Sequence, residues 1–469
     1  MYIKDRFHQF ALSDFNQPIG LKMNPENRWI KRAHMIPWFA IEDRYADLFP
    51  SNTGMPAKPL RMALGSLIIQ KQYEYSDREL VEQLTENPYY QFFIGLPGYQ
   101  QEPPFVPLLL VEFRKRLTAE ILDEINEMII EFNNPDDEPP SGDDSNTEGN
   151  VSEDEQGYKT NRGTLMIDAT CAPQNIIFPQ DICLLNEARE NLEQLIDSIC
   201  YEYNEPKPRT YRQNARKDYL ALAKRRKRSG KSLRKAIKKQ LQYIKRDLGY
   251  IGAYLSEGKE LSAQQADRIV SISQPYIRPI VRGKAKAATE FGAKIDISVD
   301  EYGDEYGMVR IEKQSFDAYN ESDVLISAVE NYCSRTGRYP ERVLADTIYR
   351  NRSNLSYCKK HGIRLSGPAL GRLKKDHSED RKVTYMDGVD RIEVERAFSL
   401  AKRCYGLGLI RTKLETTTRS SISLSIIAMN IGRLSSVFIC RFLKSVFSKY
   451  TEQLPMATDP NKNLVITCL

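Results

Sequence analysis

The sequence predicts a mixed α/β fold in which helices cover the faces of one sheet, preceded by an all-helical N-terminal region. Two short apolar segments, 163–169 and 341–346, have the composition of buried strands, and each ends in an acid. Residues 293–299 and 307–313 are strand-like and flank Gly303, which predicts a hairpin. Helical patterns separate these strands along the chain, and such alternation is typical of a mixed α/β sheet.

The N-terminal region, residues 1–133, is predicted to be a helical domain. Ser76 and Glu79 have the spacing of a capping box, which marks the start of a helix. Asn87 and Pro88 interrupt the apolar run that follows, so a second short helix is expected after a tight turn. Two short helices at such a turn resemble a DNA-binding helix-turn-helix unit, and a plain helical bundle explains the pattern equally well.

Charge is distributed unevenly along this chain of 469 residues, whose formal net charge is only +5. Residues 134–157 contain nine acids and no basic residue. Because such a composition buries too little apolar surface to order itself, an acidic disordered linker is expected there. By contrast, the run from Lys207 to Arg246 contains seventeen Lys or Arg and one acid. It falls within residues 186–275, which we predict to form a basic helical insertion.

An apolar stripe runs through the basic insertion. Its members recur at steps of three and four residues: Leu233, Ile237, Leu241, Ile244, Leu248, Ile251 and Leu255. The spacing predicts an amphipathic helix with a basic outer face. Basic side chains on such a face bind DNA by releasing counterions from its phosphates, whereas the simpler alternative is a solvated charged surface. The predicted DNA-binding residues of the insertion are Lys224, Arg225, Arg226, Lys227, Arg228, Lys231, Arg234, Lys235, Lys238 and Lys239.

The composition argues against several other classes of protein. The eight cysteines form no C-x-x-C pair and there are only four histidines, so a zinc site of ordinary spacing is not expected. The N-terminus has no apolar signal-peptide core, and charged residues interrupt the longest apolar stretch, 422–447. We therefore expect a cytoplasmic protein of a reducing compartment, with no membrane partner.

Two acids and one helix are the candidates for a chemical site. Asp168 and Asp346 each close a predicted strand, where side chains project into the crevice that binds ligands in α/β sheets. Either aspartate taken alone is more commonly a capping or turn residue. Arg391, Glu395 and Lys402 stand at offsets of zero, four and eleven, so they share one face of a helix. A structural Arg–Glu–Lys ladder explains this spacing equally well.

Three carboxylates with no nearby His or Cys match the oxygen ligands that Mg²⁺ prefers. Attack on a phosphodiester by water or by a 3′-hydroxyl is assisted by two Mg²⁺ ions, which activate the nucleophile and stabilise the leaving oxygen. In this interpretation Asp168 bridges both ions, while Asp346 and Glu395 each bind one. Mn²⁺ is an alternative that the residues do not distinguish.

Three segments resemble the insertion-sequence DDE transposases of the broad group of families four and five. The spacing Arg391-x3-Glu395-x6-Lys402, within RIEVERAFSLAKRCYGLGLIRTKL, is similar to the Y-x2-R-x3-E-x6-K signature of that group. The stretch LMIDATCAPQNIIFPQDICLLNEARE resembles the region of the first aspartate, with Asp168 in place. RVLADTIYRNRSN resembles the region of the second, with Asp346 in place.

The resemblance implies a fold and roles for residues. It implies a ribonuclease-H-like catalytic core at 158–185 and 276–415, interrupted by the basic insertion and followed by a C-terminal helix and tail at 416–469. Asp168, Asp346 and Glu395 become a catalytic metal triad, and Arg391 and Lys402 become DNA contacts near the scissile phosphate. The N-terminal domain is then expected to recognise terminal inverted repeats.

The function implied by the resemblance is DNA transposition: binding of inverted repeats, metal-dependent cleavage and strand transfer into target DNA. Work on two element ends implies a dimer in the DNA complex of this bacterial, nucleoid-associated enzyme. Two alternatives stay open. One is a catalytically inactive DNA-binding relic, which is favoured by Gly388 in place of the signature tyrosine. The other is a ribonuclease-H-like nuclease that cuts without strand transfer.

Overall fold

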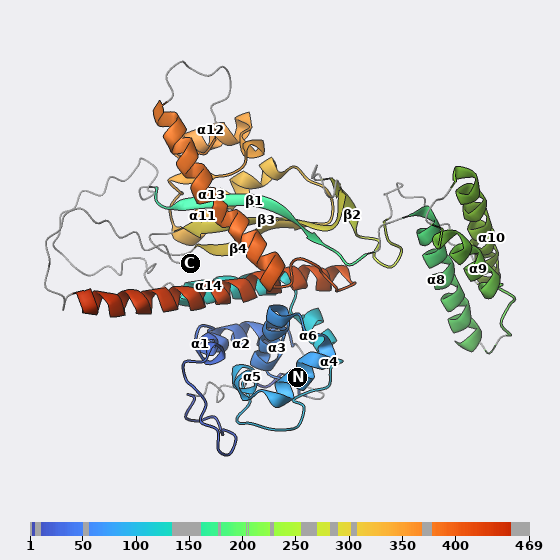
Figure 1. Cartoon of the computed structure of the whole chain (residues 1–469), viewed down its shortest axis with the longest axis horizontal. Coiled ribbons are helices and arrows are strands. Elements are labelled where there is room, and N and C mark those ends of the chain that lie inside the picture. The colour runs from blue at the N-terminus through green and yellow to red at the C-terminus, as the bar shows by residue number, and fades with distance from the viewer. Residues whose placement is uncertain are drawn as a thin grey trace.

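A mixed six-stranded sheet lies at the centre of the computed structural model, with helices packed on both of its faces (Figure 1). The prediction of a mixed α/β fold is therefore confirmed. The predicted linker at 134–157, the hairpin turn at Gly303 and the predicted DNA-binding residues Arg226, Lys227 and Arg228 lie outside the described residues. The structure describes residues 2–4, 11–49, 56–133, 161–176, 180–202, 204, 206–225, 229–254, 270–281, 289–301, 307–367 and 378–451.

The N-terminal region is helical, as predicted. The capping box is present at the start of α4, because the Ser76 hydroxyl accepts from the Glu79 N–H at 3.3 Å and the Glu79 carboxylate accepts from the Ser76 N–H at 2.8 Å. Asn87 ends α4 and caps α5. The helices are α1 (Arg28–His34), α2 (Trp38–Ala46), α3 (Leu60–Tyr73), α4 (Asp77–Glu86), α5 (Pro88–Phe93), α6 (Leu109–Arg116) and α7 (Ala119–Asn133).

The strands of the sheet run in the order β2-β3-β1-β5-β6, with β4 also paired to β3. β3 is antiparallel to β1, β2 and β4, whereas β5 is parallel to β1 and to β6. Each predicted strand is present, although the bounds differ from those expected. They are β1 (Thr164–Pro173), β2 (Arg278–Val281), β3 (Thr289–Glu301), β4 (Met308–Ser315), β5 (Arg342–Leu344) and β6 (Arg364–Leu365).

Alternate residues of β1 point to opposite faces of the sheet. Leu165 and Ile167 lie in a core formed with α11 (Leu325–Thr336) and α12 (Arg352–Lys360). Met166 and Ala172 lie in the larger core on the other face. Two long helices contribute to that second core, α13 (Ser378–Cys404) and α14 (Glu415–Thr451). Residues of β1 that share the parity of Met166 therefore face α13, which packs against β1, β3 and β5.

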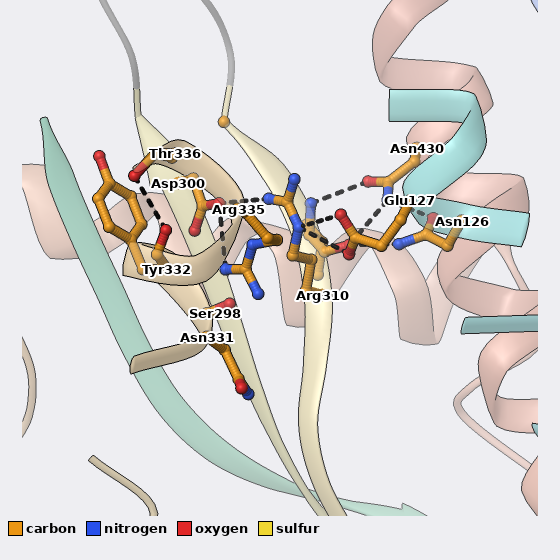
Figure 2. A network of polar contacts seen from close by, with 12 residues as sticks. Asn126, Glu127, Ser298, Asp300, Arg310, Asn331, Tyr332, Arg335, Thr336 and Asn430 are labelled. Carbon is orange, nitrogen blue, oxygen red and sulfur yellow. Dashed lines mark hydrogen bonds and ion pairs between the residues drawn. The ribbon is translucent and has the colours of Figure 1, made fainter. Parts of the chain in front are cut away.

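Helix α14 lies between the sheet and the N-terminal helices and packs on both (Figure 1). Buried residues of the N-terminal helices, β3, β4, α13 and α14 form one contiguous apolar core. Asn430 of α14 crosses this junction, because its amide donates to the Val309 carbonyl at 2.8 Å and to the side-chain Oδ1 of Asn126 at 2.9 Å, and accepts from the Val309 N–H at 3.0 Å. Arg310 of β4 pairs with Glu127 of α7 at 2.8 Å (Figure 2).

The basic insertion forms a module of three helices that stands away from the sheet: α8 (Asp181–Glu202), α9 (Arg212–Ala223) and α10 (Gly230–Tyr254) (Figure 1). The predicted apolar stripe of α10 is only partly buried. Leu241 and Leu248 are 48% and 51% exposed, whereas Gln240 and Asp247 are buried. The reason is that α10 turns a polar side to its neighbours, where the Gln240 amide donates to the Ala215 carbonyl of α9 at 2.9 Å.

In the described part of the chain, every helix is too short or too polar to span a lipid bilayer.

Candidate functional site

Asp168 lies on β1, and Asp346 follows the end of β5, the strand that pairs with β1. The parallel pairing of β1 and β5 runs from Thr164 opposite Arg342 to Met166 opposite Leu344. Two residues further along the chain are Asp168, which is still in β1, and Asp346, which lies just past the end of β5. Adjacent strands are about 4.8 Å apart, so the end of β5 that leads to Asp346 lies beside the part of β1 that leads to Asp168. The sequence did not show this register, because each aspartate was only the end of a separate apolar run.

Asp168 is half-buried in the middle of β1 rather than at its end. The Ala169 N–H donates to its carboxylate at 2.8 Å. Burial raises the pKa of the Asp168 carboxyl, as do the neighbouring carboxylates of Glu321 and Asp346, while the Ala169 N–H and the Arg391 guanidinium act to lower it. This balance shows that the charges of Asp346 and Arg391 both reach Asp168.

Asp346 is exposed and also has the role of a capping residue. It is the N-cap of the 3-10 helix η3 (Thr347–Tyr349), and its carboxylate accepts from the Thr347 N–H at 2.6 Å. The alternative that a single aspartate of this kind caps a turn is therefore confirmed for Asp346. The cap orients the carboxylate at the edge of the sheet next to Asp168.

Helix α13 carries Glu395 along the same face. At one end, Arg342 of β5 pairs with Asp390 at 2.7 Å, and at the other Lys402 donates to the Thr170 hydroxyl of β1 at 2.9 Å. Helix and strand therefore run in the same direction. From Lys402 back to Glu395 is about 10 Å along the helix, and from Thr170 back to Asp168 is about 7 Å along the strand. Measured along the axis of α13, the position of Glu395 is therefore within about one helical turn of the position of Asp168.

Ion pairs fix α13 in this position. Asp387 is buried and binds Arg364 of β6 through two hydrogen bonds of 2.6 and 2.7 Å. Arg433 of α14 pairs with Glu393, two residues before Glu395, at 3.0 Å. These contacts hold α13 against both the parallel edge of the sheet and α14. None of them was predicted from the sequence, because they join residues that are distant along the chain.

Asp168, Asp346 and Glu395 lie in one region of the molecule, but their carboxylates do not converge on a common point. Glu395 is exposed and its carboxylate lies 3.6 Å from the Arg391 guanidinium. Among the residues that the structure describes, no three His, Cys, Asp or Glu side chains are grouped closely enough to hold a metal ion. The donor chemistry of Asp168, Asp346 and Glu395 nevertheless fits a divalent ion that prefers oxygen, since all three offer carboxylates.

The other predicted DNA contacts lie in two places. Arg391 and Lys402 are on α13 beside the acids. Six of the residues predicted to bind DNA in the insertion module are exposed at a distance from the sheet: Lys224, Arg225, Lys231, Arg234, Lys235 and Lys238. Lys239 differs from these, because its ammonium binds Asp218 of α9 at 2.9 Å.

Gly388, at the place of the signature tyrosine, lies on α13. A Cβ atom at this position would meet no other atom within 4 Å, so the helix has room for a side chain there. Tyr385, three residues earlier, is exposed.

Two family models match the chain. A model described as "Transposase domain (DUF772)" matches residues 19–116, which covers most of the N-terminal helices. A model described as "Transposase DDE domain" matches residues 343–432, a range that contains Asp346 and Glu395 but not Asp168. One match thus lies in the N-terminal helices and the other in the part of the chain that includes β5, α13 and the first half of α14.

One curated relative shows a partial match. The "Uncharacterized protein ORF8 in nfe locus" of Rhizobium meliloti is 29% identical over 117 residues, which are 25% of this chain and 56% of the relative. The match therefore spans little more than half the length of the relative.

Proposed function

As this chain belongs to the insertion-sequence DDE transposase family, we propose that it binds the terminal inverted repeats of an insertion sequence, cleaves DNA at the element ends and joins the 3′-hydroxyls to target DNA. The observation that supports the proposal is that Asp168 lies on the face of β1 that packs against α13, the helix of Glu395, and that Asp346 follows the end of β5, the strand paired with β1. The proposal includes membership in the broad group of insertion-sequence families four and five.

The proposed catalytic core is ribonuclease-H-like and consists of residues 158–185 and 276–415. In support of it, the antiparallel strands β4, β3 and β1 continue into the parallel strands β5 and β6, an arrangement typical of ribonuclease-H-like sheets. In the same proposal residues 1–133 recognise the inverted repeats, 186–275 are a helical insertion and 416–469 are the C-terminal helix and tail.

The proposed cofactors are two Mg²⁺ ions, with Mn²⁺ as a substitute, held by Asp168, Asp346 and Glu395. Bound divalent ions supply activation of the attacking oxygen and stabilisation of the leaving oxygen. The protein's own contribution is to orient the substrate. Lys402, held at the Thr170 hydroxyl, and Arg391, beside Glu395, are cations placed to bind a phosphate next to the acids.

Double-stranded DNA is the proposed partner, both as terminal repeat and as target. The exposed basic residues of α9 and α10 favour this proposal, because cations that neutralise phosphates release counterions and increase affinity. A dimer is proposed for the DNA complex, since two element ends must be processed together.

The proposal is tested with purified protein, Mg²⁺ and a labelled duplex that carries the terminal repeat. The wild type should produce cleaved and joined products. Asp168→Asn should abolish both and leave duplex binding unchanged, while Asp47→Asn, which changes an exposed aspartate of the N-terminal region, should behave as the wild type. Binding without cleavage by the wild type would indicate a relic, and cleavage without joining would indicate a nuclease.

A further inference from the structure

A buried carboxylate lies behind the Asp168–Asp346 pair, on the opposite face of the sheet. Asp296 of β3 is directly opposite Ala169 of β1 and is completely buried. Two tyrosine hydroxyls donate to it, that of Tyr349 at 2.7 Å and that of Tyr319 through a short hydrogen bond. The two tyrosines come from different loops, so Asp296 joins both loops to the centre of the sheet.

The first of these loops contains Asp346. Tyr349 is the last residue of η3, the turn that Asp346 caps, and its N–H donates to the Asp346 carbonyl at 3.0 Å. Its ring is completely buried. The Asp346 carboxylate itself accepts hydrogen bonds from the N–H and the hydroxyl of Thr347, the next residue of the same turn. The direction of the carboxylate therefore depends on the position of its turn, and Tyr349 anchors that turn.

The second loop leads to α11 and is tied to the first. The Asn354 amide donates to the Tyr349 carbonyl at 2.9 Å and to the Ser322 carbonyl at 2.8 Å. Lys294, which shares a face of β3 with Asp296, donates to the Tyr319 carbonyl at 2.9 Å and pairs with Glu321 at 2.8 Å. Asp296 thus accepts a hydrogen bond from each loop, and Lys294 adds two contacts to the second loop.

We propose that Asp296 is a positioning residue, which acts through the Tyr349 hydroxyl to fix the turn of Asp346 relative to Asp168. This inference rests on the proposed function, because it concerns the carboxylates that would hold the metal ions. Groups that hold metal-binding side chains in place contribute strongly to binding, and their loss typically lowers metal affinity 10- to 100-fold.

The test is Mn²⁺ binding by the complete chain, measured from the electron paramagnetic resonance signal of the free ion. Tyr349→Phe removes one hydroxyl and keeps the buried ring, and it should weaken Mn²⁺ binding about 10- to 100-fold. Tyr332→Phe is the matched control, because Tyr332 is equally buried and its hydroxyl donates to the Arg162 carbonyl at 2.8 Å, away from both aspartates. The control should bind Mn²⁺ as the wild type does.

Two further variants separate positioning from a general loss of structure. Asp296→Asn keeps one acceptor oxygen and should weaken Mn²⁺ binding less than Asp296→Ala, at equal circular dichroism. If Tyr349→Phe and Asp296→Ala bind Mn²⁺ as the wild type does while Asp346→Asn does not, the inference is overturned and the proposed function stands. If the wild type itself binds no Mn²⁺, or if Asp168→Asn and Asp346→Asn leave binding unchanged, the proposed function fails and the inference with it.

Discussion

Asp346 shows how one side chain can serve both structure and chemistry. Its carboxylate caps η3 through the Thr347 N–H, and a capping aspartate of this kind is a common stabilising feature at the start of a turn. The same bond restricts the carboxylate at the end of β5, the strand that pairs with the β1 strand of Asp168. A ligand that is oriented before a metal ion arrives loses less conformational freedom on binding, so the structural role supports the chemical one.

Asp296 should make the stability of the protein depend on pH. Burial raises the pKa of its carboxyl to about 6 from an ordinary value of 3.8, against the lowering effect of the two tyrosine hydroxyls. A raised folded-state pKa contributes stability below the unfolded value, and this contribution is lost as the pH rises through the folded value. Between pH 4 and pH 7 the wild type should therefore lose roughly 2–3 kcal/mol relative to D296N.

Urea unfolding of both proteins across that pH range gives the measurement. The difference between their free energies of unfolding isolates Asp296, because the other carboxyl groups titrate in both. A difference that stays constant with pH would show that Asp296 ionises in the folded protein as it does in the unfolded chain.

At the scale of elements, signals confined to a few residues were predictable from the sequence. The capping box of α4 is confirmed, because Ser76 and Glu79 meet within a single turn of helix. The ends of strands were less predictable. β1 continues past Asp168 to Pro173, since β3 accompanies it over that whole length while its pairing with β5 ends at Met166. The length of a strand is thus decided by partners that are distant in sequence.

The outward face of α10 could not be predicted for a similar reason. Periodicity identifies a stripe of leucine and isoleucine residues, but only the packing of α8 and α9 decides which side of the helix is covered. The structure covers Gln240 and Asp247 and leaves Leu241 and Leu248 exposed. The contribution of Asp296 was missed as well, because a single aspartate in a strand-like segment has no distinguishing spacing.

The exposed lysines of α10 should account for part of the affinity for DNA that is independent of sequence. Replacing Lys231, Lys235 and Lys238 together by glutamine removes three cations from the exposed side of the module. If each contacts a phosphate, the slope of log affinity against log salt concentration should decrease by about 2.7 for duplex DNA. Fluorescence anisotropy at several salt concentrations measures this slope.

Lys239→Gln is the matched control for the triple variant, because the Lys239 ammonium is bound to Asp218 within the module. It should change the slope by much less than one. An unchanged slope in the triple variant would identify the basic face of α10 as a solvated surface, which is the alternative left open by its sequence.

Asn430 should be important for the junction between α14, β4 and α7. Asn430→Ala leaves the Val309 N–H and the Asn126 side-chain oxygen without their Asn430 partner and removes one of the two amide donors to the Val309 carbonyl (Figure 2). Leaving such groups unsatisfied costs about 1–3 kcal/mol each, so the free energy of unfolding should fall by roughly 2–4 kcal/mol. Denaturant unfolding measures the loss, and Ser436→Ala, at an exposed site of the same helix, should change stability by less than about 0.5 kcal/mol.

At the scale of the whole molecule, the two segments that match transposase families are not separate bodies. The N-terminal helices share one apolar core with the sheet, α13 and α14, and α14 packs on both α3 and α7. Arg310 of β4 adds a buried ion pair to Glu127 of α7. A movement of the N-terminal helices away from the sheet would break these contacts, so the N-terminal helices and the sheet are expected to keep a fixed relation.

This shared core predicts how the molecule unfolds. A fragment of residues 1–133 lacks α14, and the buried apolar residues Ile125 and Ile129 of α7 belong to the core that includes that helix. Without it the fragment should bind the dye ANS and show no cooperative thermal transition, because exposed apolar surface and loose packing go together. Adding a second chain that contains 158–469 should restore the transition. A cooperative transition in the isolated fragment, at the temperature of the complete chain, would instead show that the N-terminal helices are stable by themselves and that α14 only lies against them.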